Sequence, residues 1–243
     1  MSTTARPIVL VLGAGAGIGA NVASCFADAG YAVALAARSL PTSKQNPSRL
    51  EIHADLSQPS VIPAIFSTVE KELGEPPSVV IYNAASRTLA QADDPLGSMP
   101  LEDYHRDMTV GLHNAVAAAQ EAVRGFKTLP KSRATTYIYS GNKLNVMSDP
   151  KTWPFGIART GMAHFIWDCS VAYQEKGYRF YFTDERLSDG SPSRELMDPV
   201  ERAAVYLRLC RAESQLQWHY TYVKGRGYVD FRGVDDPWAV KGS

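Results

Sequence analysis

The sequence predicts a single α/β domain built on a doubly wound, mainly parallel sheet of seven strands. Short apolar runs alternate along the chain with segments of helical period, as in strands joined by right-handed crossover helices. The runs are continuous, as in strands buried on both faces. The 243 residues are 45% hydrophobic, and no repeat or linker divides them. We therefore expect residues 1–243 to form one domain.

The first half of the chain opens with a strand at 7–12, "PIVLVL". A helix follows, with apolar residues at Ile18, Val22 and Phe26, and stops at Gly30. The next elements are strands at 31–38, 49–56 and 78–85, a polar loop at 41–48 and a helix at 58–73.

The second half continues the same alternation. Its elements are a proline-containing loop at 86–100, a long helix at 101–126, a strand at 134–141, a long helix at 153–175, a strand at 178–185, a helix at 199–213 and a final strand at 218–231.

Composition excludes several classes of function. Net charge is zero, so no basic surface predicts a nucleic-acid or membrane partner. No run of about 18 apolar residues could span a bilayer, and the N-terminal apolar run is interrupted by glycine, which favours a strand over a signal peptide. Cys25, Cys169 and Cys210 lie far apart without metal-site spacing. We expect no metal, no disulfide and a cytoplasmic location.

A glycine-rich turn, "LGAGAGIGANVA", directly follows the first strand and opens the first helix. Residues without a side chain permit a tight turn and close approach to a pyrophosphate, and the helix N-terminus offers free N–H groups to the phosphates. This context favours a Rossmann-type dinucleotide site over a turn that binds nothing. The cofactor candidates in the turn are Gly13, Gly17, Ile18 and Gly19.

The Gly-xxx-Gly-x-Gly spacing and several later motifs resemble the short-chain dehydrogenase/reductase family over essentially the whole chain. "HADLS" follows the third strand, "NAA" follows the fourth, and a serine ends the fifth. "FTDERLSDGSP" (182–192) replaces the family's Pro-Gly, and its "DER--DG-P" pattern is similar to a divergent fungal branch. The resemblance implies cofactor contacts from Asp55, Leu56, Asn83, Ala84 and Ala85.

Arg38 and Ser39 end the second strand, about 20 residues beyond the glycines. An acidic residue there would accept a hydrogen bond from a ribose hydroxyl and favour NAD, whereas an arginine can pair with a 2′-phosphate. A solvated surface arginine is the alternative. We therefore predict NADP(H) as the cofactor, with Arg38 and Ser39 in its site.

The family's catalytic tetrad of Asn, Ser, Tyr and Lys is mostly lost. Gly111 stands at the Asn position, Ser140 is kept, Phe155 replaces the Tyr and Arg159 the Lys. No tyrosine lies between Ser140 and Arg159, so no shift of the alignment restores the pair. We expect Ser140 to orient the substrate, Arg159 to hold the cofactor and Lys143 to be a replacement donor.

The remaining candidates surround the expected substrate. Asn142, Trp153, Phe155 and Met162 are predicted substrate contacts, and residues 182–198 are a predicted substrate-side loop. By resemblance, the two long helices are also expected to pack across a homodimer or homotetramer interface.

Three functions remain open for such a chain. The first is an NADPH-dependent reductase of a small C=N or C=O substrate, since hydride addition to an iminium needs no proton at the carbon step, whereas a ketone leaves an alkoxide that needs an acid. The second is an enzyme that uses the fold for isomerisation or cyclisation, and the third is a non-catalytic NADP(H)-binding protein.

Overall fold

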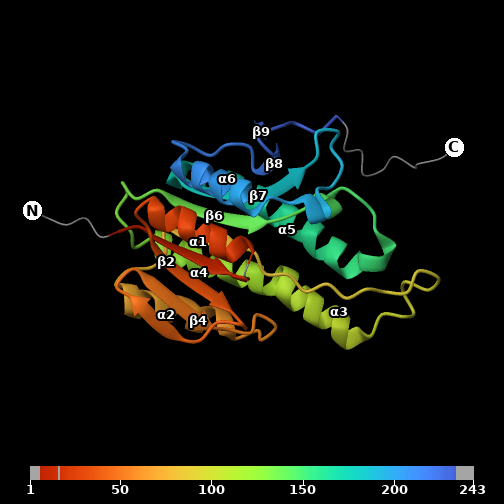
Figure 1. The fold of residues 1–243 in the computed structure, drawn as a ribbon, viewed down its shortest axis with the longest axis horizontal. Helices are drawn as coiled ribbons and strands as arrows, with labels where there is room; N and C mark the ends of the chain where they lie inside the picture. The colour runs from red at the N-terminus through yellow and green to blue at the C-terminus, as the bar shows by residue number, and fades with distance from the viewer. Residues whose placement is uncertain (1–5, 16, 234–243) are drawn as a thin grey trace, which may run out of the picture.

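The computed structural model describes residues 6–15 and 17–233, and Figure 1 shows strands in the middle of the molecule with helices on both sides. One nine-stranded sheet has the order β3-β4-β2-β1-β5-β6-β7-β8-β9. The strands are β1 (Ile8–Leu12), β2 (Ala32–Ala37), β3 (Ser43–Asn46), β4 (Arg49–His53), β5 (Val79–Tyr82), β6 (Thr135–Ser140), β7 (Tyr178–Arg186), β8 (His219–Val223) and β9 (Gly227–Tyr228).

The seven strands from β4 to β8 in this order pair in parallel, which confirms the predicted doubly wound core. Every residue of β1, β2 and β5 is buried, because helices cover both faces of these central strands. The continuous apolar runs in the sequence follow from this double burial.

The predicted number of seven strands was wrong, because the sheet has two further short strands, β3 and β9, that pair antiparallel at its edges. β3 lies inside the predicted loop 41–48 and pairs antiparallel with β4. Its residues are polar and mostly exposed, so no apolar alternation marks it. The predicted final strand 218–231 is two strands, β8 and β9, joined by a tight turn in which Gly225 and Gly227 have positive φ.

Two hydrophobic cores lie on the two faces of the sheet. One core joins the sheet to α2 (Val61–Leu73), α4 (Asn114–Phe126) and α5 (Trp153–Ala172). The other joins it to α1 (Ile18–Asp28) and α6 (Pro199–Arg211). Four single-turn helices lie in the connections: η2 (Lys143–Asn145), η3 (Pro150–Thr152), η4 (Gln174–Lys176) and η5 (Arg194–Leu196).

The long helix predicted at 101–126 contains a wide turn. α3 (Leu101–Met108) leads into a π-helical turn, η1 (Thr109–His113), and α4 follows without a break. A Cβ on Gly111 would lie 2.9 Å from the Cβ of Ala158, so glycine lets α5 approach closely here. The hydroxyl groups of Tyr82 and Tyr139 donate to the carbonyls of Val110 and Gly111 in this turn.

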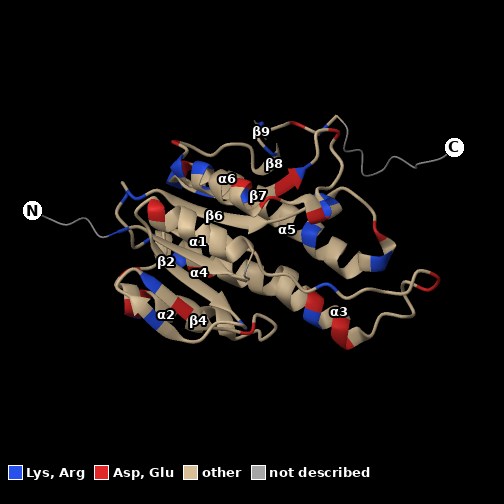
Figure 2. Ribbon diagram, in the orientation of Figure 1, with Lys and Arg blue, Asp and Glu red and all other residues tan. Residues whose placement is uncertain are grey.

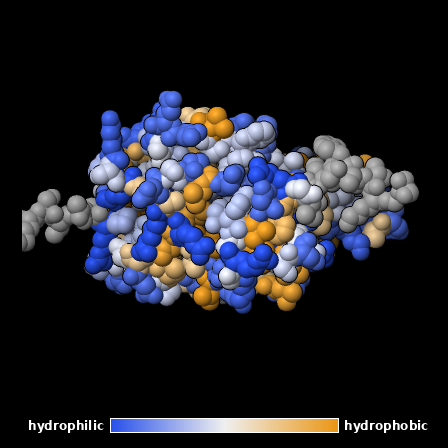
Figure 3. Space-filling model, turned by 90° about the horizontal axis from the view of Figure 1, so that it is seen from above, coloured by the Kyte–Doolittle hydropathy of each residue, from blue (hydrophilic) through white to orange (hydrophobic). Residues whose placement is uncertain are grey.

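Positive and negative residues are mixed in the view of Figure 2. In it α2 and α3 each carry both signs of charge, in keeping with the zero net charge. On the face seen in Figure 3, hydrophobic residues form small groups among hydrophilic ones. Within the described ranges, no helix combines the length and apolar character needed to cross a membrane.

Candidate active site

The carboxyl ends of the parallel strands meet at one end of the molecule, together with α3 and the start of α5 (Figure 1). The chain winds in opposite directions from β1 and β5, which are neighbours in the sheet. Ligands of open α/β sheets bind at such a switch point. Two pockets lie at this edge.

The first, here the glycine pocket, has a volume of about 640 Å³. It is lined by residues that follow β1, β2, β4 and β5 and by residues of the α3–η1 segment. The lining residues are Gly13, Gly15, Ala37, Arg38, Ser39, Ala54, Asp55, Leu56, Ser57, Asn83, Ala84, Ala85, Ser86, Arg106 and Val110.

Gly13 lets the loops after β1 and β5 pack directly against each other. Its φ is +83°, and an added Cβ would lie 2.4 Å from the backbone nitrogen of Ala84. Asn83 Nδ2 donates to the carbonyl of Gly13 at 3.0 Å. Only glycine fits this contact, which holds the pocket floor against the "NAA" turn.

The glycine turn fits a dinucleotide. α1 begins at Ile18 after Gly17, and no side chain caps its first N–H groups, which stay available to phosphate oxygens. A Cβ on Gly19 would lie 2.6 Å from Ala14, so Gly19 serves close packing rather than lining the pocket. Gly15, which was not among the predicted cofactor contacts, lines the pocket. An added Cβ at this position would have no atom within 4 Å.

The far side of the glycine pocket carries the residues predicted to select the nucleotide. Arg38 and Ser39 line it beside Asp55. The Ser57 backbone N–H, and to a smaller extent the Arg38 guanidinium, lower the pKa of the Asp55 carboxyl. Arg38 thus lies close enough to Asp55 to act on its charge.

Two residues outside the predicted set support this pocket. Arg106 of α3 lines it, and its guanidinium pairs with Asp103 and donates to Thr88 at 2.9 Å. Asn114 is buried and donates to the carbonyls of Leu56 and Gln58 at 2.8 and 3.0 Å. From the start of α4, Asn114 therefore fixes the loop after β4, a role that no motif in the sequence indicates.

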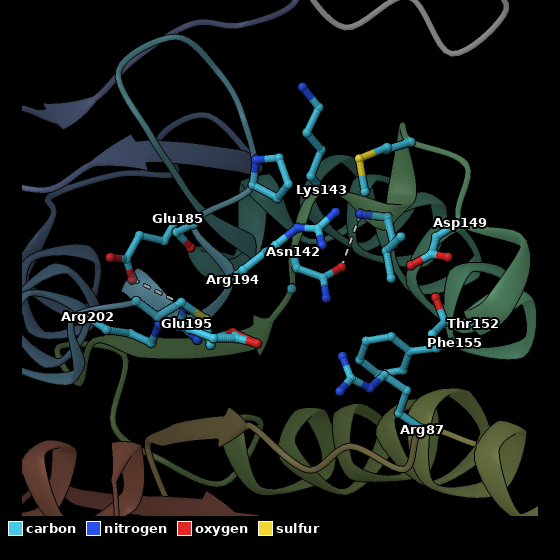
Figure 4. Close-up of a pocket in the computed structure, with 16 residues that line it drawn as sticks. Arg87, Asn142, Lys143, Asp149, Thr152, Phe155, Glu185, Arg194, Glu195 and Arg202 are labelled. Carbon is cyan, nitrogen blue, oxygen red and sulfur yellow. Dashed lines mark hydrogen bonds and ion pairs between the residues drawn. The ribbon is translucent and has the colours of Figure 1, made fainter. Parts of the chain in front are cut away.

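The second pocket, here the Phe155 pocket, has a volume of about 310 Å³ and lies between the segments that follow β6 and β7 (Figure 4). The lining residues are Arg87, Gly141, Asn142, Lys143, Leu144, Met147, Asp149, Thr152, Phe155, Glu185, Pro192, Ser193, Arg194, Glu195, Met197 and Arg202.

Arg159 lies behind Phe155, away from solvent. It is 3% exposed, and its guanidinium carbon is 4.1 Å from the centre of the Phe155 ring and 4.9 Å from that of Tyr139. Nη1 donates to the hydroxyl of Tyr139, while Nε has no partner. No carboxylate of the described residues pairs with it. The cation is held by two aromatic faces and one hydroxyl.

Tyr139 connects Arg159 to the π-helical turn. Its hydroxyl accepts from Arg159 and donates to the carbonyl of Gly111 at 2.7 Å. Burial raises the pKa of the Tyr139 phenol, although the Arg159 guanidinium opposes this effect. Tyr139 does not line the Phe155 pocket, so this neutral tyrosine positions Arg159 rather than meeting a ligand.

Ser140 faces away from Arg159. Its hydroxyl accepts from Tyr206 at 2.7 Å and from Arg202 at 3.3 Å, both on α6, and it does not line the Phe155 pocket. Successive side chains of a strand point to opposite faces, so Tyr139 and Ser140 cannot share one. The role of Ser140 as a substrate-orienting residue stays a prediction, and its contacts in the structure are with α6.

A buried ion pair borders the Phe155 pocket. Arg202 Nη2 and Glu185 Oε2 lie 3.2 Å apart, and the Tyr222 hydroxyl donates to the same oxygen at 3.3 Å. Glu185 belongs to the segment that replaces the family's Pro-Gly, but nothing in the sequence indicated Arg202 as its partner.

The other predicted residues divide between the Phe155 pocket and the core. Asn142, Lys143 and Phe155 line the pocket, and Lys143 Nζ donates to the carbonyl of Gly190 at 2.8 Å. The prediction that Met162 contacts the substrate is wrong, because Met162 is 0% exposed and packs in the core against the sheet. The same prediction for Trp153 is also wrong.

Trp153 turns toward the 86–100 loop instead of the pocket. Its Nε1 donates to the carbonyl of Pro95 at 2.9 Å, and its ring stacks on Tyr104. The predicted loop 182–198 also needs adjustment: residues 182–186 belong to β7, and the connection begins at Leu187.

Among residues 6–15 and 17–233, no group of three or more His, Cys, Asp or Glu side chains could hold a metal ion. Cys25, Cys169 and Cys210 are free thiols.

Comparison with known proteins gives consistent matches. The sequence model of the short chain dehydrogenase family matches residues 7–177. The chain is 36% identical over 241 residues to the short chain dehydrogenase/reductase dmxR12 of Cryptosporiopsis sp. (strain 8999), covering 95% of this chain and 97% of that one. It is 33% identical over 182 residues to an uncharacterized oxidoreductase of Caenorhabditis elegans, covering 71% of this chain and 56% of that one.

Solved structures share the fold at low sequence identity. The 3-ketoacyl-(acyl-carrier-protein) reductase from Brucella melitensis, complexed with NADH, superimposes with a TM-score of 0.76 at 14% identity, covering 91% of this chain and 98% of that one. A short-chain type dehydrogenase/reductase from Mycobacterium marinum gives a TM-score of 0.72 at 20% identity, covering 89% and 93%.

Proposed function

Because this chain belongs to the short-chain dehydrogenase/reductase family, we propose that it is an NADPH-dependent reductase that acts on a small C=N or C=O substrate without a tyrosine acid. The observation that carries the proposal is the stack of Phe155 on Arg159. This stack places a buried cation behind the wall of the Phe155 pocket, and the residues that line the pocket include no tyrosine.

The glycine pocket supports binding of a dinucleotide. Gly15 leaves open space for a pyrophosphate, and the uncapped start of α1 provides N–H donors. Arg38 at the end of β2 offers a guanidinium to a 2′-phosphate, as NADP(H) would require. When bound, the nicotinamide would supply the hydride.

The protein's own groups decide which substrates suit the Phe155 pocket. A ketone gains negative charge on oxygen as hydride arrives and needs a proton, which Phe155 lacks. An iminium becomes a neutral amine without one. The Arg159 guanidinium adds positive charge behind the ring and can stabilise an oxyanion in a poorly solvated site. The missing phenol thus favours a substrate that needs little acid catalysis, whereas the cation favours one on which negative charge develops.

We also propose a homodimer or homotetramer. Supporting this, Ile157, Trp167 and Val171 leave apolar surface exposed along α5. Such surface is typical of a face that packs against another chain.

Arg38→Ala tests the choice of nucleotide. We expect the variant to bind NADPH about 10- to 100-fold more weakly, since a charge-assisted contact to phosphate contributes about 1.5–3 kcal/mol. NADH binding should not change. Titrations followed by protein fluorescence measure both affinities, and Arg49→Ala, at the opposite end of the neighbouring strand β4, is the control.

The same titrations separate the alternatives. If wild-type protein binds neither nucleotide, the reductase proposal is wrong. Tight NADPH binding without oxidation by any imine or ketone would indicate a non-catalytic nucleotide-binding protein. Conversion of a substrate without net NADPH use would indicate an isomerase or cyclase.

A further inference from the structure

Two arginines approach the Phe155 pocket from different loops and have no partner among residues 6–15 and 17–233. Arg87 lies in the 86–100 loop and Arg194 in the connection after β7, and both appear beside the cavity in Figure 4. Neither side chain makes a hydrogen bond or ion pair with any residue of the described ranges. From this we propose that the pocket binds a substrate with an anionic group, a carboxylate or phenolate on an apolar body, through Arg87 and Arg194.

The residues on both sides of Arg87 are held by one buried carboxylate. Asp107 of α3 is 1% exposed. Its Oδ1 accepts from the Ser86 hydroxyl at 2.5 Å, and its Oδ2 accepts from the Thr88 backbone N–H at 2.7 Å. The neighbours of Arg87 are therefore held to α3 while its guanidinium stays free for a ligand, the pre-organisation that favours binding.

The connection that carries Arg194 is also held at both ends. The Gly190 carbonyl accepts from Lys143 Nζ at 2.8 Å and from Arg186 Nη1 at 3.2 Å, and the Asp198 N–H donates to Glu185 at 2.9 Å. Between these points Arg194 has a φ of +46°, a left-handed conformation adopted by no other non-glycine residue in the described ranges. Such conformations gather at binding sites where the surroundings enforce them.

The carboxylates of the pocket leave this positive charge available. Glu185 is paired with Arg202 and Tyr222. Asp149 accepts from the Lys151 N–H as the cap of η3. Glu195 also lines the pocket and makes no ion pair with a described residue, so it offsets part of the positive charge without contacting Arg87 or Arg194. Neither guanidinium group therefore contacts a carboxylate of the part of the chain that the structure describes.

Apolar side chains supply the rest of the wall. Leu144, Met147, Phe155, Pro192 and Met197 line the cavity. A volume of about 310 Å³ suits a molecule of one or two rings. The inference rests on the proposed function only in treating this ligand as the substrate to be reduced, because binding of the anion itself needs no nucleotide.

The experiment compares two probes that differ in charge, 1-naphthoate and 1-naphthamide, by titration calorimetry on the full chain. We expect wild-type protein to bind the naphthoate at least about 10-fold more tightly, as charge-assisted hydrogen bonds predict. In Arg87→Gln/Arg194→Gln this preference should vanish, and in Arg87→Lys/Arg194→Lys it should be partly retained. Lys151→Gln, a charge near the pocket but outside its lining, should keep it.

Equal affinity of wild-type protein for the two probes would overturn the inference, as would an undiminished preference in the double glutamine variant. Thermal unfolding of each variant establishes that it is folded. NADPH titration of the same samples keeps the two proposals apart. Nucleotide binding without naphthoate preference would refute only the anionic substrate, and naphthoate preference without nucleotide binding would refute only the reductase.

Discussion

Phe155→Tyr should raise the rate of NADPH-dependent ketone reduction by about 100-fold or more, because an acid positioned at the reacting oxygen typically contributes 10²- to 10⁴-fold. The ring already lines the Phe155 pocket, so the change adds a hydroxyl to an existing wall. The Arg159 guanidinium, 4.1 Å from the ring centre, would lower the pKa of the new phenol and so favour proton exchange near neutral pH.

Loss of NADPH absorbance with small ketones and small cyclic iminium ions measures this gain. Iminium reduction should change little, since it needs no proton at the carbon step. Phe155→Leu, which removes the ring and adds no donor, should not gain ketone activity. If Phe155→Tyr binds NADPH normally and reduces ketones no faster than wild type, residue 155 does not face the reacting atoms.

Gly13→Ala should destabilise the protein and abolish nucleotide binding together. The added Cβ would lie 2.4 Å from Ala84 in a backbone of φ +83°, so strain and overlap should cost at least about 2 kcal/mol. For a domain of this size that lowers the Tm by roughly 4–8 °C.

Gly15→Ala separates the two effects. Its added Cβ has no atom within 4 Å, so the Tm should stay at the wild-type value, while NADPH affinity should fall because Gly15 lines the glycine pocket. Thermal unfolding and NADPH titration of both variants test this contrast. A Gly13→Ala protein with wild-type Tm would show that the contact between the β1 and β5 loops is not rigid.

The sequence predicted the parallel core and the glycine turn because local patterns encode them. Continuous apolar runs follow from burial on both faces, and a glycine directly between strand and helix has few other uses. β3 escaped prediction because its pairing is held by the backbone and its side chains are polar.

The environment of the candidate site was less predictable, since it depends on which face of an element a residue occupies. Met162 is one helical turn from Arg159 yet lies in the core, and Tyr139 meets Arg159 only because the sheet packs on α5. Arg87 and Arg194 line the same pocket from loops more than 100 residues apart, a separation in sequence that no local pattern spans.

The π-helical turn η1 changes the direction in which side chains point along the helix over 101–126. Each residue of an α-helix advances about 100° around the axis, so one residue accommodated in a wide turn rotates everything after it by that amount. Asn114, the first residue after this turn, donates to the loop that follows β4. A deletion of one residue at η1 would remove this extra rotation and turn Asn114 away from that loop. Relatives that differ by one residue here should therefore hold the loop after β4 by other contacts.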